Sequence, residues 1–225
     1  MHLNNRNLKM ILKKHIIYGA RGHGRSLLYS LKNDGLEILC FIDQDKDLLG
    51  NCISGIPIYK SLDDFQNIND KNDEISILIG VGGTNSTDRK YLFEQVIRKN
   101  YSIDTYISKS AIVMNTCSLS KGVQILLNTT IAGNVKIREG VIVNSGSIIE
   151  HDSSVGAFTH IAPGVTICGS VHIGNMSFIG AGSTILPGIK IGSNSIVGAG
   201  SLVTKDIESN MISYGSPAKV IKARE

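Results

Sequence analysis

Several features that would place this chain in a common class are scarce or missing. There is no tryptophan, there are only four prolines, and charged side chains make up 19% of the residues. The hydrophobic fraction is an ordinary 42%, which together with the low charge excludes a disordered chain and a coiled coil. No apolar run approaches the roughly 18 residues needed to span a bilayer. The first residues, MHLNNRNLKMILKKHIIYG, are too polar and too interrupted for a signal peptide.

The cysteines and the charge balance exclude further classes. The four cysteines, at positions 40, 52, 117 and 168, form no CxxC pair and have no metal-ligand spacing. We therefore expect reduced thiols and a cytoplasmic location. The net charge of +4 is not concentrated in the Lys/Arg stripe that is typical of nucleic-acid-binding proteins, so no nucleic-acid partner is expected. We interpret the basic N-terminal stretch as a solvated terminus.

Charged and aromatic side chains become rare near residue 105. The 97 residues from Ile107 to Val203 carry only eight charged side chains and two aromatic ones, Phe158 and Phe178. This shift predicts two domains, residues 1–105 and 106–225. The excess of 33 isoleucines over 18 leucines favours strands over helices, because β-branched side chains fit pleated surfaces and lose rotamer freedom in helices.

The second block repeats with a period of six residues. Every sixth position is isoleucine, valine or leucine, without an insertion, over seventeen steps. These positions are Ile107, Val113, Leu119, Ile125, Ile131, Ile137, Val143, Ile149, Val155, Ile161, Ile167, Ile173, Ile179, Ile185, Ile191, Val197 and Val203. Four positions after each of them stands a residue that is nearly always small or β-branched.

A period of six does not fit one face of a helix, which repeats at 3.6, but it fits a short strand followed by a corner. Three such strands close a triangular coil, so the seventeen hexads predict a parallel β-helix of between five and six coils. A single coil cannot bury its aliphatic residues, so the array is stable only as a stack. Residues 204–225 lose the repeat and are expected to cap the exposed strand edge, with a turn at Gly215 and Pro217.

The first block predicts an α/β domain of Rossmann-like type with a parallel sheet. We expect strands at 15–18, 39–43 and 75–79, and helices at 26–35 and about 88–100. Strands and helices that alternate with short joins indicate parallel strands connected by crossovers.

A glycine-rich turn, from Gly19 to Gly24, joins the first strand to the first helix. Such a turn exposes N–H groups at a helix N-terminus, where phosphates bind. Asp43 follows nineteen residues after Gly24, where a ribose or base could be held, and Arg21 and Arg25 add positive charge. The spacing G-x-x-G-x-G differs from the dinucleotide pattern G-x-G-x-x-G, so a plain structural turn is the alternative.

Three histidines, His151, His160 and His172, lie in the repeat region. His151 is the most distinctive, because Glu150 and Asp152 on either side are two of only three carboxylates in that region. A carboxylate beside an imidazole orients the ring and raises its basicity, as a general base near neutral pH requires. Histidines satisfied on the wall of the β-helix are the alternative. A zinc site of the kind found in β-helical carbonic anhydrases is not expected, because the spacing of nine and twelve residues gives no strong reason for convergence.

Four features together resemble the PglD/NeuD-like sugar O-/N-acyltransferases: the GARGHG loop, the hexapeptide repeat, the segment I-E-H-D and the terminal G-S-P-A-K. The resemblance covers about residues 15–222. It implies a left-handed parallel β-helix and a homotrimer, with acetyl-CoA bound along the outside of the β-helix between neighbouring subunits. It also implies that the N-terminal domain holds a nucleotide-linked amino sugar.

The same resemblance implies roles for individual residues. His151 would take a proton from the sugar amine as it attacks the thioester, and Asp152, which is often glutamate in relatives, would support its basicity. The implied acetyl-CoA contacts are His160, Gly169 through its N–H at the oxyanion, Ala181, Ala199 and Pro217. The implied diphosphate loop is Arg21, Gly22 and His23, and the implied nucleoside pocket includes Asp43 and Gly80.

The expected function is therefore that of an acetyl-CoA-dependent N-acetyltransferase acting on a nucleotide-linked amino sugar, of the 4-amino-4,6-dideoxy type, for surface glycan biosynthesis such as that of O-antigen lipopolysaccharide. Direct attack in a ternary complex is expected, with no acyl-enzyme and no metal. The alternatives are O-acetylation of a sugar such as sialic acid, and a non-catalytic solenoid that senses a nucleotide. An oxidoreductase is disfavoured because the N-terminal domain is short and its glycine spacing is wrong. The sugar and its nucleotide (UDP, dTDP or GDP) stay open.

Overall fold

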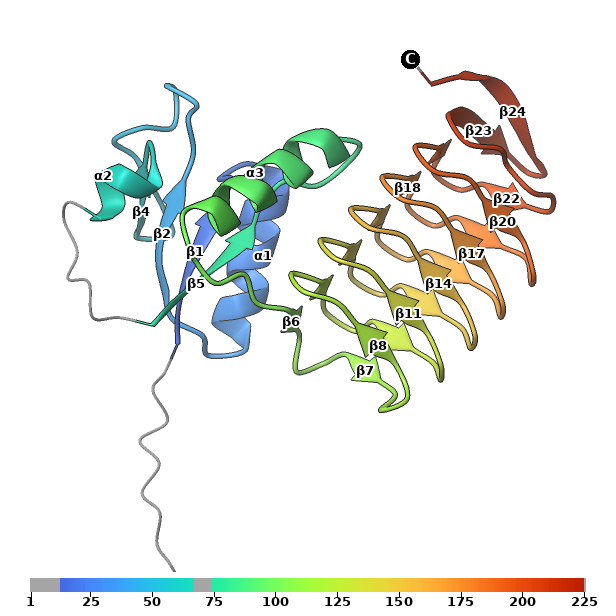
Figure 1. The fold of residues 1–225 in the computed structure, drawn as a ribbon, viewed down its shortest axis with the longest axis horizontal. Helices are drawn as coiled ribbons and strands as arrows, with labels where there is room; N and C mark the ends of the chain where they lie inside the picture. The colour runs from blue at the N-terminus through green and yellow to red at the C-terminus, as the bar shows by residue number, and fades with distance from the viewer. Residues whose placement is uncertain (1–12, 67–73, 225) are drawn as a thin grey trace, which may run out of the picture.

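The computed structural model describes residues 13–66 and 74–224, which form an α/β unit followed by an elongated solenoid (Figure 1). Residues 1–12 of the basic N-terminal stretch lie outside the described residues. Within the described part of the chain, no helix is both long enough and apolar enough to cross a membrane.

The N-terminal unit is built around a five-stranded sheet with the order β3-β4-β2-β1-β5. Its strands are β1 (Lys14–Tyr18), β2 (Ile38–Ile42), β3 (Cys52–Ile53), β4 (Ile56–Tyr59) and β5 (Ile75–Ile79). Its helices are α1 (Gly22–Asn33), α2 (Leu62–Gln66) and α3 (Ser86–Arg98). Strands β4, β2, β1 and β5 are parallel, whereas β3 pairs with β4 in the antiparallel direction. The predicted parallel sheet is confirmed, and an antiparallel hairpin extends its edge.

Two local differences separate this unit from the prediction. Helix α1 begins at Gly22, inside the glycine-rich turn, and not at residue 26. The hairpin of β3 and β4 is absent from the sequence prediction; β3 is only two residues long, and β4 contains Pro57, which lacks the N–H that a strand donates. Pro57 lies opposite Cys52 in the outermost pair of strands, where a missing donor is tolerated.

The solenoid consists of seventeen two-residue strands, one for each hexad (Figure 1). They are β6 (Tyr106–Ile107), β7 (Ile112–Val113), β8 (Ser118–Leu119), β9 (Gln124–Ile125), β10 (Thr130–Ile131), β11 (Lys136–Ile137), β12 (Ile142–Val143), β13 (Ile148–Ile149), β14 (Ser154–Val155), β15 (His160–Ile161), β16 (Thr166–Ile167), β17 (His172–Ile173), β18 (Phe178–Ile179), β19 (Thr184–Ile185), β20 (Lys190–Ile191), β21 (Ile196–Val197) and β22 (Leu202–Val203). The predicted left-handed parallel β-helix is confirmed, and the first strand of the solenoid begins at Tyr106. The division into domains at residue 105 stays a prediction.

Each strand pairs in parallel with the strand 18 residues further on, so that one coil stacks on the next. The three faces are a sheet of β7, β10, β13, β16, β19 and β22, a sheet of β8, β11, β14, β17 and β20, and a sheet that runs from β6 to β21. We call them the β13 face, the β14 face and the β15 face. From Ile125 to Val203 every hexad aliphatic residue is at most 4% exposed, whereas Ile107 at the open end is 42% exposed. The aliphatic ladder is therefore the core of the solenoid.

The small residues of the repeat also have a polar function inside the coil. The Ser147 hydroxyl donates to the Ala162 carbonyl oxygen at 2.9 Å, and the Thr159 hydroxyl donates to the Gly174 carbonyl oxygen at 2.8 Å. The same Thr159 oxygen accepts a hydrogen bond from the Ser177 N–H in the next coil. These hydroxyls satisfy backbone groups that would otherwise be buried without partners at the corners.

The segment after Val203 forms the predicted cap. Strand β23 (Met211–Gly215) continues the β15 face in parallel with β21, and β24 (Ala218–Ala223) pairs with it in the antiparallel direction. The turn lies at Gly215–Pro217, as expected. At the far end of the hairpin, Arg224 donates to the carbonyl oxygens of Thr84, at 3.0 Å, and Met176, at 3.3 Å. The cap is thus bonded both to the solenoid and to the loop that follows β5.

The inward and outward positions of one strand make the role of the ladder testable. Ile191 is 2% exposed and its neighbour Lys190 is exposed on the opposite side of β20. Ile191→Ala is expected to lower the free energy of unfolding by about 2–5 kcal/mol, because it leaves a cavity in the core. Lys190→Ala is expected to change it by about 0.5 kcal/mol or less. Denaturant unfolding at one protein concentration measures both, and equal losses would contradict the ladder.

Candidate active site

His151 and Asp152 form a hydrogen-bonded pair on an exposed corner of the solenoid. They make up the turn between β13 and β14, and His151 Nδ1 lies 2.9 Å from Asp152 Oδ2. The Asn134 side chain, one coil below, donates to the other carboxylate oxygen at 3.1 Å. These hydrogen bonds, first that from His151 and then that from Asn134, lower the pKa of Asp152. Asp152 is therefore a carboxylate at neutral pH, held by two donors.

The carboxylate determines which nitrogen of His151 is free to act. A carboxylate only accepts hydrogen bonds, so Nδ1 carries the hydrogen of this bond, and in the neutral ring Nε2 keeps its lone pair. The His151 side chain is 62% exposed, so Nε2 is within reach of a ligand. Asp152 adopts a left-handed backbone with φ of +58°, a conformation that asparagine and aspartate tolerate better than most residues. An imidazole held in this way by a carboxylate can act as a general base.

Gly169 lies one coil above His151 and leaves room for its ring. A Cβ atom at this position would lie 2.6 Å from His151 Nε2, which is closer than atoms in contact allow. The Gly169 carbonyl oxygen accepts from the Gly188 N–H, whereas its own N–H donates to no group among the described residues. Gly169 therefore lies beside the imidazole, and its N–H is a backbone donor that the described residues leave unused. The contact of this N–H with an oxyanion stays a prediction.

Three of the residues predicted to contact acetyl-CoA lie on a different edge of the solenoid. Ala181 and Ala199 stand at the turns between the β15 face and the β13 face, and Pro217 follows in the turn of the capping hairpin. All three are exposed and are spaced by 18 residues, one coil apart. His151 and Gly169 lie on the edge between the β13 and β14 faces. A single chain therefore divides the predicted site between two edges.

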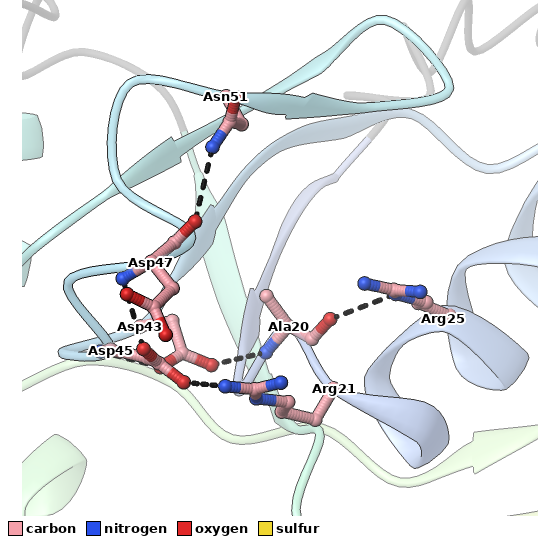
Figure 2. A network of polar contacts seen from close by, with 7 residues as sticks. All are labelled: Ala20, Arg21, Arg25, Asp43, Asp45, Asp47 and Asn51. Carbon is pink, nitrogen blue, oxygen red and sulfur yellow. Dashed lines mark hydrogen bonds and ion pairs between the residues drawn. The ribbon is translucent and has the colours of Figure 1, made fainter.

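The glycine-rich loop is shaped by an acidic segment that follows β2 (Figure 2). Asp43 Oδ2 accepts a hydrogen bond from the Ala20 N–H at 2.7 Å, and Oδ1 accepts from the Asp45 N–H at 3.0 Å. Asp45 in turn is ion-paired with Arg21, and Arg25 donates to the Ala20 carbonyl oxygen at 3.3 Å. Both oxygens of Asp43 are thus used to hold the loop. Arg21 is exposed, but its guanidinium is held by the Asp45 carboxylate.

Helix α1 begins inside this loop, which leaves backbone donors at its end. The N–H groups of its first residues, Gly22, His23 and Gly24, have no carbonyl partner within the helix, as at every helix N-terminus. A Cβ atom on Gly24 or on Gly80 would overlap the Gly19 carbonyl oxygen, so both glycines are required for strand β5 and helix α1 to meet the loop. Gly80 therefore packs against the loop, in addition to the nucleoside role predicted for it.

A small cavity of about 180 Å³ lies beside the loop, at the carboxyl ends of the strands. It is lined by Tyr18, Gly19, Ile42, Asp43, Gln44, Val81 and Leu92. Ligands of open α/β sheets bind outside the carboxyl ends of the strands, and the lining here is apolar apart from the ends of three side chains. The cavity has the position and the character expected of a nucleoside pocket.

His23 and His160, predicted to contact the diphosphate and acetyl-CoA, lie between the two parts of the chain. His23 Nε2 is 2.8 Å from Gln124 Oε1 on β9, and its pKa is lowered by burial to about 4. His160 Nδ1 accepts from the Gly83 N–H at 2.7 Å and Nε2 lies 3.3 Å from the Asn144 amide. Burial, and then the charges of His23 and Arg89, lower the pKa of His160 to about 3. A contact between His160 and a cofactor would require one of these partners to yield, so that role stays a prediction.

Arg89 bonds the N-terminal unit to the solenoid. Its side chain comes from α3, is 1% exposed, and donates to the carbonyl oxygens of Val81, Gly140 and Phe158. Burial lowers the pKa of Arg89 to about 10, so it remains charged at neutral pH. Three carbonyl dipoles replace the water that the guanidinium loses.

Sequence reasoning missed Arg89, Gln124 and Asn134. Their partners are far away along the chain, at separations of 51, 101 and 18 residues respectively. For Asn134 a signal existed, because the coil repeat of 18 residues places it directly below Asp152.

The three histidines of the zinc alternative lie on different parts of the solenoid: His151 on an edge, His160 on the β15 face and His172 on the β14 face. Among the described residues no group of three or more His, Cys, Asp or Glu side chains is arranged to hold a metal ion.

Two family models match the chain, one in each part. The PglD N-terminal domain matches residues 14–96, and the bacterial transferase hexapeptide (six repeats) matches residues 170–205. Over 77 residues the chain is 32% identical to the bifunctional protein GlmU of Acinetobacter baumannii (strain AYE), a match that covers 32% of this chain. The chain spans only 17% of the length of that curated relative.

Several solved structures match along nearly the whole chain. One is a variant of perosamine N-acetyltransferase from Caulobacter crescentus, with a histidine replaced by asparagine, in complex with CoA and GDP-perosamine; it has a TM-score of 0.85 and 25% identity, over 93% of this chain and 97% of that chain. The acetyltransferase domain of PglB from Neisseria gonorrhoeae FA1090, in complex with acetyl coenzyme A, has a TM-score of 0.83 and 26% identity, over 92% and 98%. WeeI from Acinetobacter baumannii AYE has a TM-score of 0.83 and 25% identity, over 93% and 100%.

The fold and these matches define the class of the protein. It is an acyltransferase built on a hexapeptide-repeat β-helix. The PglD-type N-terminal domain narrows this class. The chain thus combines a PglD-type N-terminal domain with a hexapeptide-repeat β-helix, and the solved structures that it resembles along nearly its whole length include sugar acetyltransferases of the PglD/NeuD-like type.

The buried neutral imidazoles predict a loss of stability in mild acid. The pKa values of His23 and His160 lie at about 4 and about 3 in the folded protein and near 6.5 in the unfolded chain. The unfolded chain therefore binds protons first, and the free energy of unfolding falls, as the pH drops below 6.5, by up to about 1.4 kcal/mol per pH unit for each ring. Denaturant unfolding between pH 6.5 and 5 should give a shallower slope for His160→Gln than for the wild type. His15, whose pKa burial also lowers, affects both proteins alike. Equal slopes would show that the His160 ring is not kept neutral by the fold.

Proposed function

We propose that the enzyme is an acetyl-CoA-dependent N-acetyltransferase whose acceptor is a nucleotide-linked amino sugar of the 4-amino-4,6-dideoxy type. The observation that carries the proposal is the His151–Asp152 pair, exposed beside Gly169 on a hexapeptide β-helix that also bears a PglD-type N-terminal domain. Two solved relatives add support, since one is bound to CoA and GDP-perosamine and another to acetyl coenzyme A. One relative was also studied with a histidine replaced, which supports a role for a histidine in this family of sites.

His151 is the base in the proposed reaction. The sugar amine attacks the carbonyl carbon of the acetyl thioester, so that a C–N bond forms and the C–S bond breaks. Nε2 of His151 accepts the proton that the amine loses and then returns it to the departing thiolate of CoA. The Asp152 carboxylate, which accepts from Nδ1, stabilises the imidazolium that forms between these two transfers.

Other residues of the chain bind and orient the two co-substrates in this proposal. The Gly169 N–H donates to the oxygen that becomes negative when the amine attacks. The small side chains of Ala181 and Ala199 let the pantetheine chain of acetyl-CoA lie close to the edge between the β15 and β13 faces. Pro217 lies at the capped end of this edge. The helix end at Gly22–Gly24 binds the diphosphate of the sugar nucleotide, with Arg21 beside it, and the cavity next to Asp43 holds the nucleoside.

We further propose that the working enzyme is a homotrimer. In one chain the general base and the cofactor edge are separated by the β13 face, and that face exposes apolar side chains: Ile112 is 58% exposed, Met114 49% and Ile148 38%. If this face packs against neighbouring copies, the base of one chain meets the cofactor edge of the next, and each complete site contains two chains. The proposed location is the cytoplasm and the proposed process is surface glycan biosynthesis, such as that of O-antigen lipopolysaccharide.

The acceptor can be tested by supplying acetyl-CoA with three kinds of sugar: GDP-perosamine, the uridine- and thymidine-linked 4-amino-4,6-dideoxy sugars, and free sialic acid. Release of the CoA thiol is expected with at least one nucleotide-linked amino sugar and not with sialic acid, because an amine needs less help from a base than a hydroxyl does. Thiol release with sialic acid alone would establish an O-acetyltransferase in its place. No release with any sugar would favour a non-catalytic nucleotide-sensing solenoid.

The role of the His151–Asp152 pair can be tested separately. His151→Ala is expected to lower kcat by at least about a hundredfold, the usual contribution of a general base. Asp152→Asn, which suits the left-handed backbone, is expected to lower kcat by about tenfold, because the imidazole loses its charged partner. Lys190→Ala is the surface control. An unchanged melting temperature would show that both variants are folded, and turnover of His151→Ala near that of the wild type would rule out the assigned base.

A further inference from the structure

A groove of about 770 Å³ lies on the β14 face, directly beside the His151–Asp152 pair. Asp152 lines its rim, and its floor is formed by the outward side chains of β8, β11, β14 and β17. None of the roles assigned above uses this groove. The residues predicted to bind acetyl-CoA lie on another edge of the same chain, and the glycine-rich loop lies on the N-terminal unit.

The register of the coils explains why the β14 face is hollow at this point. Along the first strand positions the residues paired from coil to coil are Ser118, Lys136, Ser154 and His172, so that a serine stands on each side of Lys136. The residue that directly follows each strand also points outward. At this position Gly156 stands one coil above Arg138, and it also lines the groove. Small residues thus surround two long cationic side chains that lie on the same side of β11.

These two cations are notable because the solenoid has so few charges. Only eight charged residues occur between Ile107 and Val203, and Lys136 and Arg138 stand two positions apart. Both are exposed, and neither forms an ion pair with a described residue. The Asp152 carboxylate is the acidic group in the lining, and it is already hydrogen-bonded to His151 and Asn134. The two positive charges are therefore not neutralised within the groove.

The rest of the lining can donate hydrogen bonds to an anion. Hydroxyl groups come from Thr116 and Ser118, and the amide of Asn175 stands at the opposite side. The Ser154 hydroxyl is bonded to His172 Nδ1 at 2.8 Å, which orients the ring within the groove. Two unpaired cations and several neutral donors are the chemistry that recognises phosphate groups.

We propose that Lys136 and Arg138 form a binding site for the phosphate groups of a nucleotide co-substrate, next to the catalytic pair. This inference rests on the proposed function, because it takes His151 as the base that both co-substrates must reach. The phosphates belong either to the diphosphate of a sugar nucleotide presented by a neighbouring chain or to acetyl-CoA. In both cases the site holds the charged part of the molecule while its reactive end extends to His151.

The test compares the full-length wild type with Lys136→Ala/Arg138→Ala and with Lys190→Ala. Lys190 is the matched control, because it stands at the same strand position of the β14 face, in register with His172, but outside the groove. Isothermal titration calorimetry at low and at high salt measures binding of four probes: UDP, GDP, dTDP and CoA. Weaker binding of the nucleoside diphosphates identifies the sugar nucleotide as the source of the phosphates, and weaker binding of CoA identifies the cofactor.

The double variant is expected to bind one of these probe classes at least about tenfold more weakly than the wild type, as the loss of charge-assisted hydrogen bonds predicts. Its affinity should also depend less on salt, because exposed charges are screened. Lys190→Ala should stay within about twofold. Wild-type affinity in the double variant for all four probes, or a wild type that binds none of them, would overturn the proposal.

Binding is measured without turnover, so the two proposals can fail separately. If the groove variants lose nucleotide binding and the wild type transfers no acetyl group, the phosphate site stands and the proposed function falls. If transfer occurs and the double variant binds and reacts like the wild type, the function stands and the phosphate site falls. The charge-conserving variant Lys136→Arg/Arg138→Lys should retain most of the affinity, which distinguishes lost charge from a disturbed strand.

Discussion

The structure depends on one constraint, the stacking of each coil on the coil 18 residues away. The aliphatic residue of every hexad lies against its counterparts in neighbouring coils, and the parallel backbone bonds hold that register. Because the register is the same at the corners, the turn that contains His151 lies between Gly133 and Gly169, and Asn134 lies below Asp152. The corner that carries His151 and Asp152 is therefore positioned by the same repeat that forms the core, and no separate scaffold is needed for it.

The repeat also explains which features could be predicted from the sequence. The β-helix, its seventeen strands and its cap follow from a strict period, and the His151–Asp152 pair follows from two adjacent residues, so both kinds of information are local. Contacts across the two parts of the chain are different. Nothing in the nearby sequence shows that His23 meets Gln124, 101 residues away, or that Arg89 bonds to the carbonyl oxygen of Gly140, 51 residues away. Likewise the sequence shows a small or β-branched residue four positions after each aliphatic one, but the period alone does not show that the hydroxyls at this position bond the corners together.

The interface between the two parts of the chain contains buried polar side chains around His23, His160 and Arg89. A buried guanidinium, two neutral imidazoles and a glutamine amide each bond to a specific backbone or side-chain group. Such groups are costly to bury unless every partner is in place, so they favour one relative orientation of the nucleotide loop and the solenoid over sliding alternatives. The segment of residues 82–83 lies at this junction, next to His23 and His160, and it directly follows Val81, which lines the small cavity beside the glycine-rich loop.

The hydrogen bonds of Arg224 to Thr84 and Met176 have a consequence for how such a chain can change its length. A solenoid can in principle gain or lose whole coils without disturbing its core, because every coil presents the same surface to the next. Here the last residues of the cap reach back to the loop after β5, so an extra coil between Met176 and the cap would carry Arg224 out of reach. The hairpin can therefore reach the loop after β5 only when the solenoid has the number of coils seen here.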